Sequence, residues 1–345
     1  MIEFRSDTFT LPTPRMMEAI QNATLGDDVY GEDPTVRALE EETALILGKE
    51  AAILMPSGTM ANLSSIMAHC PRGSKILVGD ESDIYIYEAA GASVCGGIMY
   101  EKIPTMLDGT LRIQDLEEVF PKDMDDPQFA IPSLICIENT HNRMGGRVLP
   151  LSYLEELKLF SVDKNIPVHM DGARLFNAAI SLGVEPKVIT EYADTVQICL
   201  SKGLSSPIGS MVAGSKEFIN KVYRIRKMLG GGMRQAGIIA APGLIALEES
   251  IRRLTVDHEH ARLLAEGLAN IPGVIIDIEN VETNIVFFRI DPSKLTTDTF
   301  IKEAHGRGLN LAELGTDRIR VVTHSGINST DVEKTLKIIH SILAG

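Results

Sequence analysis

The sequence predicts an α/β fold with a mostly parallel central sheet covered by helices, and three observations lead to this prediction. Between about residues 50 and 215, short apolar runs alternate with stretches of helical character. The clearest of these stretches, Leu154–Lys164, places apolar residues near helical spacing. After Arg234 the alternation gives way to long helices and a few short strands. Strands that alternate with helices favour parallel pairing with helices on both faces, whereas the C-terminal pattern indicates a smaller α+β unit.

The length of 345 residues indicates two domains. We expect a large domain at 1–250 and a small C-terminal α+β domain at 251–345. The predicted strands of the large domain are Ala51–Met55, Lys75–Val78, Leu134–Glu138, Val168–Asp171, Val196–Leu200 and Ser210–Ala213. Long helices are expected over Gln235–Asn270, followed by Val274–Ile276, Asn284–Ile290, Phe300–Arg307, Arg318–Val322 and a final helix. For that final helix the spacing of Thr330 and Glu333 predicts a capping box.

The composition argues against several classes of partner. Acidic residues outnumber basic ones by 47 to 33, giving a formal net charge of -14. Such a surface repels phosphate backbones and anionic membranes, so we expect neither nucleic acid nor membrane as a partner. Four cysteines without a CxxC pair indicate thiols in a reducing compartment and no metal site. The N-terminus lacks the apolar core of a signal peptide, and we therefore predict a cytoplasmic protein.

Ligands of parallel sheets bind at the carboxyl ends of the strands, so the loops that follow the strands are the places to look for chemistry. The first such loop holds Ser57, Gly58 and Thr59, between a predicted strand and a helix. Free backbone N–H groups at a helix start attract anions, and glycine allows close approach of a phosphate. The alternative is an ordinary turn with a helix cap, because the segment matches neither the Walker pattern nor GxGxxG.

Two further strand ends carry a carboxylate and an amine. Asp171 ends a buried strand, where its carboxylate could hold a protonated ring nitrogen, although a plain helix cap is the alternative. Lys202 follows another apolar strand; a desolvated lysine has a lowered pKa and can form a Schiff base, although an exposed loop lysine is common. Together with the anion seat, these are the groups that pyridoxal 5'-phosphate (PLP) requires.

Eight strings of residues, spread over nearly the whole chain, carry a family resemblance. They are RSDTFT (5–10), GDDVYGEDPTV (26–36), PSGTMAN (56–62), ENTHNRMGGRVLP (138–150), HMDGARLFNA (169–178), LSKGLSSPIGS (200–210), RKMLGGGMRQAG (226–237) and RVVTH (320–324). The chain thereby resembles the low-specificity L-threonine aldolases, PLP-dependent enzymes of fold type I in the β-eliminating lyase group. The resemblance implies the PLP-dependent transferase-like fold and a homotetramer, a dimer of dimers with shared active sites.

The resemblance also implies roles for individual residues. Lys202 matches the lysine that carries PLP, and Asp171 matches the partner of its ring nitrogen. The remaining cofactor-binding positions are Ser57, Gly58, Thr59, Arg174 and Arg234, the last implicated from a neighbouring subunit. The substrate-binding positions are Ser6, Tyr30, Tyr87, His141, Arg174 and Arg320, of which Ser6, Arg174 and Arg320 match groups that hold the substrate carboxylate and His141 one that recognises the β-hydroxyl.

One position departs from the family pattern. Many relatives have a histidine that stacks on the cofactor ring, where this chain has Asp83. The identity of the base that deprotonates the substrate hydroxyl is therefore open between His141, Asp83 and an ordered water. The activity implied is cleavage of L-threonine or L-allo-threonine to glycine and acetaldehyde. The alternatives are cleavage of a bulkier β-hydroxy amino acid such as phenylserine, β-elimination, and a non-catalytic PLP-binding protein.

Overall fold

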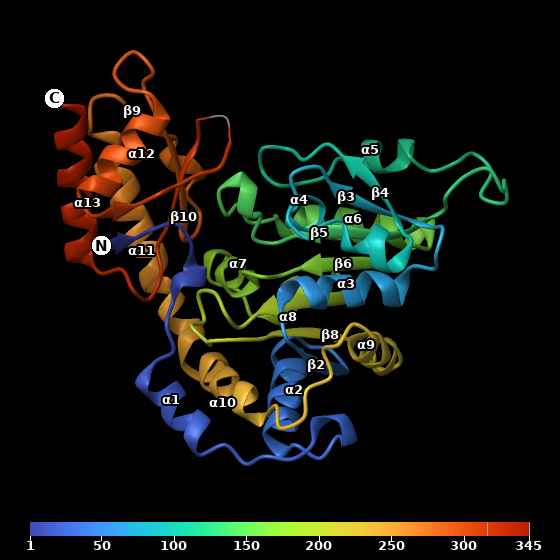
Figure 1. Cartoon of the computed structure of the whole chain (residues 1–345). Helices are drawn as coiled ribbons and strands as arrows, with labels where there is room; N and C mark the ends of the chain where they lie inside the picture. The colour runs from blue at the N-terminus through green and yellow to red at the C-terminus, as the bar shows by residue number, and fades with distance from the viewer. Residues whose placement is uncertain (316, 345) are drawn as a thin grey trace.

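The computed structural model describes residues 1–315 and 317–344. Its centre is a seven-stranded sheet with the strand order β2-β8-β7-β6-β5-β3-β4 (Figure 1). Strand β8 runs antiparallel to both of its neighbours, and every other pair is parallel. The strands are β2 (Ala51–Met55), β3 (Lys75–Gly79), β4 (Met99–Ile103), β5 (Pro132–Glu138), β6 (Val168–Asp171), β7 (Thr195–Cys199) and β8 (Ser210–Gly214). The predicted α/β class and mostly parallel sheet are confirmed.

All six predicted strands of this sheet are present, with ends that differ by no more than two residues. The sequence analysis missed the edge strand β4. Its residues Met99–Ile103 include a glutamate and a lysine, and four of the five are at least partly exposed. Strand β4 has little apolar surface to bury, so it lacks the apolar run that marks β2 at the opposite edge, whose residues lie in two core clusters.

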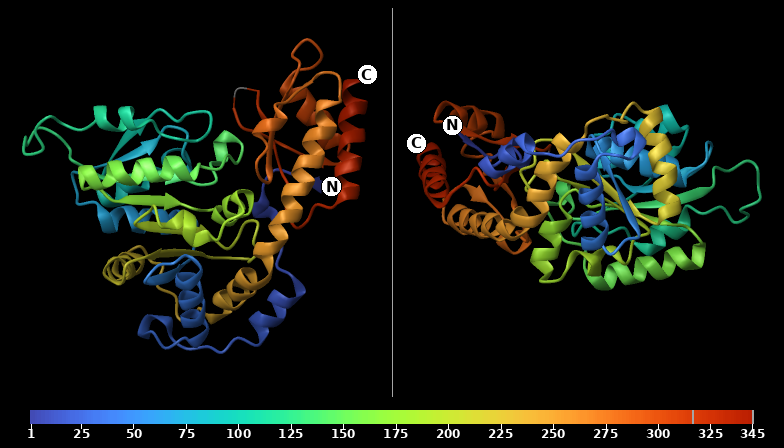
Figure 2. Two further views of the ribbon diagram at one scale, coloured as in Figure 1. Left: turned by 180° about the vertical axis from the view of Figure 1, so that it is seen from behind. Right: turned by 90° about the horizontal axis from the view of Figure 1, so that it is seen from below.

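Helices cover both faces of the sheet, including β2 at its edge. In β2, Ala52 and Leu54 point into one core cluster, whereas Ile53 and Met55 point into another. The first cluster packs against α2, α6, α7 and α10, and the second packs against α3 and α9 (Figure 2). The helices of this part are α1 (Pro14–Gln21), α2 (Pro34–Ile46), α3 (Gly58–His69), α4 (Asp83–Ile86), α5 (Ile113–Glu118), α6 (Leu151–Lys164), α7 (Leu175–Leu182), α8 (Pro186–Thr190), α9 (Lys216–Met228) and α10 (Gly237–Ile245).

The C-terminal part has its own antiparallel sheet of order β12-β13-β10-β9 and its own core cluster. Helix α11 leads into it, and the N-terminal strand β1 pairs with β11, which brings Phe4 into the same core. Both termini lie at this end of the molecule (Figure 1). The division at residue 250 stays a prediction. The elements are β1 (Ile2–Glu3), α11 (Ile251–Ala269), β9 (Val274–Ile275), β10 (Ile285–Ile290), α12 (Thr297–Gly306), β11 (Leu309–Asn310), β12 (Ala312–Glu313), β13 (Ile319–Val322) and α13 (Ser329–Leu343).

The capping box predicted for the final helix was placed two residues too late. Helix α13 begins after Asn328, whose side chain accepts a hydrogen bond from the Asp331 N–H while the Asp331 carboxylate accepts one from the Asn328 N–H. Asparagine caps a helix as well as threonine does, so a pattern restricted to Ser or Thr overlooked it. Among the helices of the described residues, none combines the length and apolar character that a membrane span requires.

Candidate active site

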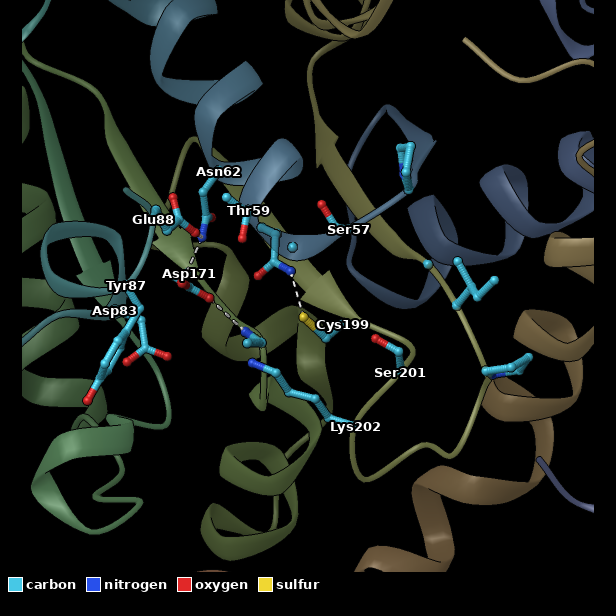
Figure 3. Close-up of a pocket in the computed structure, with 17 residues that line it drawn as sticks. Ser57, Thr59, Asn62, Asp83, Tyr87, Glu88, Asp171, Cys199, Ser201 and Lys202 are labelled. Carbon is cyan, nitrogen blue, oxygen red and sulfur yellow. Dashed lines mark hydrogen bonds between the residues drawn. The ribbon is translucent and has the colours of Figure 1, made fainter. Parts of the chain in front are cut away.

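A cavity of about 310 Å³ lies at the carboxyl ends of β2, β6 and β7 (Figure 3). It brings together the anion seat, the carboxylate and the amine that the sequence places on three separate loops. The sequence-predicted residues that line it are Ser57, Gly58, Thr59, Asp83, Tyr87, Asp171 and Lys202. Asn62, Glu88, Gln197 and Cys199 line it as well and were not predicted.

The anion seat is the first turn of α3. Ser57 is the cap, and its hydroxyl accepts a hydrogen bond from the Met60 N–H at 3.2 Å. The N–H groups of Gly58 and Thr59 belong to the turn that has no acceptor within the helix, and the positive end of the helix dipole lies there. A Cβ atom on Gly58 would lie 3.0 Å from Cys199 Sγ, so glycine allows the close approach of α3 to β7. This turn fits an anionic group such as a phosphate.

Asp171 is the buried carboxylate at the end of β6. It accepts hydrogen bonds from Asn62 Nδ2 at 2.8 Å and from the Ala173 N–H at 3.0 Å. Burial raises the pKa of Asp171, and the Lys202 ammonium opposes this rise. A cation or N–H donor entering the cavity would therefore gain a charged, oriented partner.

Glu88 is a second acid in the same wall. Its Oε1 accepts a hydrogen bond of 2.8 Å from the Asn62 amide that also serves Asp171. Burial, and next the negative charge of Asp171, raise the pKa of Glu88 to about 8. The sequence offers one signal for Glu88: it is the single acidic residue in the stretch Ile86–Gly91, whose other residues are apolar or small.

Lys202 reaches the cavity from the loop after β7, where Thr10 Oγ1 donates to its backbone carbonyl at 2.8 Å. The prediction that the pKa of Lys202 is lowered is wrong. Burial lowers the pKa of Lys202, but Cys199 and the carboxylates Asp171 and Asp7 outweigh it, and the net pKa is raised. The free amine must therefore lose a proton before it can act as a nucleophile.

Beside the cavity lies a buried ion pair that joins the N-terminal segment to the large sheet. Arg174 donates from Nε and from an Nη atom to the two carboxylate oxygens of Asp7, both at 2.7 Å. Burial by itself would raise the pKa of Asp7, but the Arg174 guanidinium outweighs it and holds that pKa well below its usual range. Ser6, next in the chain, accepts a hydrogen bond from the Thr8 N–H.

A second chain of contacts links the cavity to the C-terminal sheet. Arg320 donates to Asn142 Oδ1 at 2.8 Å, and Asn142 Nδ2 donates to the Asp83 carboxylate at 3.1 and 3.3 Å. Arg320 also donates to the Arg5 carbonyl at 2.8 Å. Glu138, which the sequence analysis missed, accepts from the N–H groups of Asp83 and Asn142, both at 2.8 Å. Arg320 thus stands near the N-terminal segment, although it does not line the cavity.

His141 and Tyr87 have different surroundings. His141 is buried and does not line the cavity, and neither ring nitrogen has a hydrogen-bond partner among the described residues. Burial lowers the pKa of His141 to about 4, against the opposing charge of Asp83. Tyr87 lines the cavity, and its hydroxyl accepts a hydrogen bond from Arg143 at 2.8 Å.

Six of the predicted residues do not line this cavity: Ser6, Arg174, His141 and Arg320, described above, and Tyr30 and Arg234. Tyr30 is 76% exposed and lines another cavity of about 450 Å³. Arg234 pairs with Asp27 at 3.1 Å, and its carbonyl accepts from the Asp28 N–H. The two residues therefore belong to one neighbouring region of the surface, away from Lys202.

Comparison with known proteins identifies the class. The model of the beta-eliminating lyase family matches residues 3–291, and the chain belongs to this family. Within it, the chain is 44% identical to low-specificity L-threonine aldolase 1 of Arabidopsis thaliana, over 97% of this chain and 94% of that protein. It is 43% identical to the low specificity L-threonine aldolase of Escherichia coli strain K12, over 95% of each chain. The family resemblance expected from the motifs is confirmed.

The fold has solved counterparts. The structure of the Leishmania major threonine aldolase superposes with a TM-score of 0.84 at 17% identity, covering 99% of this chain and 100% of that chain. Because the two sequences are only 17% identical, this structural similarity supports the fold of the chain and nothing beyond it.

Proposed function

We propose that this protein is a PLP-dependent aldehyde-lyase that cleaves L-threonine or L-allo-threonine to glycine and acetaldehyde. The observation that carries the proposal is the single cavity lined by Lys202, Asp171 and the Ser57–Thr59 turn. The relatives that are 43% and 44% identical are named for this reaction and match almost the whole chain.

The residues of the cavity fit PLP. The first turn of α3 would hold the phosphate, the Asp171 carboxylate would hold the protonated ring nitrogen, and Lys202 would bind the aldehyde carbon. Bound PLP, joined to the substrate amine, would supply an electron sink for the pair released when the Cα–Cβ bond breaks. A Cβ at Gly58 would press on Cys199, which explains why the seat is built on glycine.

The protein's own groups orient the substrate and move protons. Arg320 and Ser6, with Arg174 beside them, would fix the substrate carboxylate and so set which bond at Cα is aligned for cleavage. Lys202 would be the amine that the substrate amine replaces on PLP, and its raised pKa would let it carry a proton. Cleavage removes the β-hydroxyl proton, breaks Cα–Cβ, and adds a proton at Cα to give glycine.

The base for the β-hydroxyl proton is proposed from His141, Asp83 and an ordered water. Asp83 lines the cavity, whereas His141 does not line it and has a pKa lowered to about 4. Comparison of Asp83→Asn with Asp83→His tests the choice: a base role predicts severe loss of turnover in Asp83→Asn only. Equal turnover in both variants and wild type would make the Asp83 side chain incidental.

The test of the reaction is acetaldehyde release by PLP-loaded protein, fed separately with L-threonine and L-allo-threonine. Acetaldehyde together with equimolar glycine is the expected result, and the ratio of the two rates gives the preference at Cβ. Ammonia and a keto acid would instead identify β-elimination, and benzaldehyde from phenylserine alone would identify a bulkier substrate.

Assembly and location are also proposals. The exposed Tyr30 and Arg234 lie together away from Lys202, which is the arrangement expected if they complete the site of a neighbouring subunit in a homotetramer. Sedimentation of the purified protein tests this. Four free cysteines, three of them buried, together with the acidic composition, support a cytoplasmic location.

A further inference from the structure

The two acids Glu88 and Asp171 share one amide group. Asn62 Nδ2 lies 2.8 Å from Glu88 Oε1 and 2.8 Å from Asp171 Oδ2, so the two carboxylate oxygens are less than twice that distance apart (Figure 3). Both N–H bonds of the Asn62 amide are used in this way. Two carboxylates this close cannot both ionise without mutual repulsion.

The side-chain amide of Asn62 is held with its oxygen toward His169. Its Oδ1 lies 3.1 Å from His169 Nε2, and His169 Nδ1 lies 2.9 Å from Thr195 Oγ1. Burial lowers the pKa of His169 to about 3, so the ring is neutral and carries one N–H. Because Asn62 Oδ1 can only accept, this N–H is on Nε2 and Nδ1 accepts from the threonine hydroxyl. The chain of donors therefore directs the amide N–H groups to the two acids.

The surroundings of the two acids differ. Asp171 has a second donor, the Ala173 N–H, and the Lys202 ammonium acts on it strongly. Glu88 has only the shared Asn62 amide as a hydrogen-bond donor, and no lysine or arginine side chain donates to it among residues 1–315 and 317–344. The charged groups that act on Glu88 are Asp171 and Asp83, which raise its pKa, and Lys202, which opposes them. Tyr100 and Cys136, also nearby, have raised pKa values and are neutral.

We propose that Glu88 is a positioning residue that carries a proton at neutral pH, so that Asp171 is the ionised member of the pair and presents its charge to the ring nitrogen of PLP. The inference rests on the proposed function. In its neutral form Glu88 accepts from Asn62 without adding a second negative charge to a wall that must receive an anionic cofactor.

The test compares the PLP dissociation constants of wild type and Glu88→Gln from pH 7 to pH 9.5, measured by equilibrium dialysis. Glutamine has the size of the neutral acid and the same acceptor oxygen, so the two constants should agree within about twofold at pH 7. With a pKa of about 8, Glu88 ionises as the pH rises. The PLP dissociation constant of wild type should then exceed that of Glu88→Gln by about threefold or more at pH 9.5.

Glu40→Gln is the matched control. Glu40 is another partly buried glutamate whose pKa is raised by desolvation, to about 7, but it lies outside this cavity and accepts from the Leu54 N–H. The ratio of the PLP dissociation constant of Glu40→Gln to that of wild type should not change with pH. If Glu88→Gln does not fold, infrared difference spectra of Glu40→Gln protein give the answer: the carbonyl band of a protonated carboxyl group should be lost with a midpoint near pH 8.

Three results would overturn the inference. They are tenfold weaker PLP binding by Glu88→Gln at pH 7, a ratio of constants that stays flat to pH 9.5, and the absence of a carboxyl band that titrates near pH 8. Wild-type protein that binds no PLP would overturn the proposed function along with it, whereas a flat ratio with PLP tightly bound overturns the role of Glu88 alone.

Discussion

The two ends of the site are specified in different ways. At the cofactor end, Asp171 ends one buried strand and Ser57 and Lys202 follow two others, and parallel strands bring their carboxyl ends to one edge. At the substrate end, Asp7, Arg174, Asn142 and Arg320 come from the N-terminal segment, the large sheet and the C-terminal sheet. Local sequence order thus specifies the first end, and contacts between residues far apart in the chain specify the second.

The largest expected effect is at the cofactor end. Lys202→Ala removes the only lysine that lines the cavity among the described residues, and it should reduce acetaldehyde release to below about one thousandth of wild type. The matched control is Lys158→Ala, which removes a surface lysine paired with Asp194. Turnover by Lys202→Ala at more than a tenth of the wild-type rate would contradict the assignment of Lys202.

Asp171→Ala should have the next largest effect. It removes the charged partner of the ring nitrogen, and loss of one buried charged hydrogen bond weakens binding by about 10- to 100-fold. The PLP dissociation constant should rise by this factor, and turnover should fall as well. Unchanged PLP affinity and turnover would show that another group holds the ring nitrogen.

At the substrate end, Asp7→Asn leaves Arg174 buried without its counter-charge and should cost about 3 kcal/mol or more of unfolding free energy. Denaturant titration measures it. The control Asp115→Asn breaks the exposed pair with Arg112 and should cost less than about 1 kcal/mol. Equal small losses in both variants would mean that the buried pair does not tie the segment down.

The same pair predicts a pH dependence. The pKa of Asp7 is lowered in the folded protein, so its contribution to stability is present above the ordinary carboxyl pKa of about 4 and is lost as the pH falls below it. Wild type should therefore lose stability below about pH 4 by more than Asp7→Asn does. Parallel curves for the two proteins would contradict a charged Asp7.

The smallest effect separates the predicted helix cap from the observed one. Asn328→Ala should destabilise the protein by about 1 kcal/mol, because α13 loses its cap. Thr330→Ala, in the first turn, should change the unfolding free energy by less than about 0.5 kcal/mol. The opposite order would restore the capping box predicted from the sequence.

The features that could be predicted from the sequence are those whose signal lies within a short stretch of the chain. The six predicted strands are short and mostly apolar, and three of them carry the cofactor-end residues at, or within three residues after, their last positions. The pairing of Asp7 with Arg174 spans 167 residues, and no local pattern announces it. Glu88 and Asn62 were missed because their roles come from a shared hydrogen bond across 26 residues. Tyr30 and Arg234 were predicted from resemblance alone, and the chain by itself does not bring them to the cavity.

The most direct test of the central claim is to find which residue carries the cofactor. Borohydride reduction of the PLP-loaded protein, followed by peptide mass spectrometry, should place a pyridoxyl phosphate group on Lys202 and on no other lysine. The adduct should be absent from Lys202→Ala. An adduct on a different lysine, or none on a protein that nevertheless releases acetaldehyde, would contradict the account.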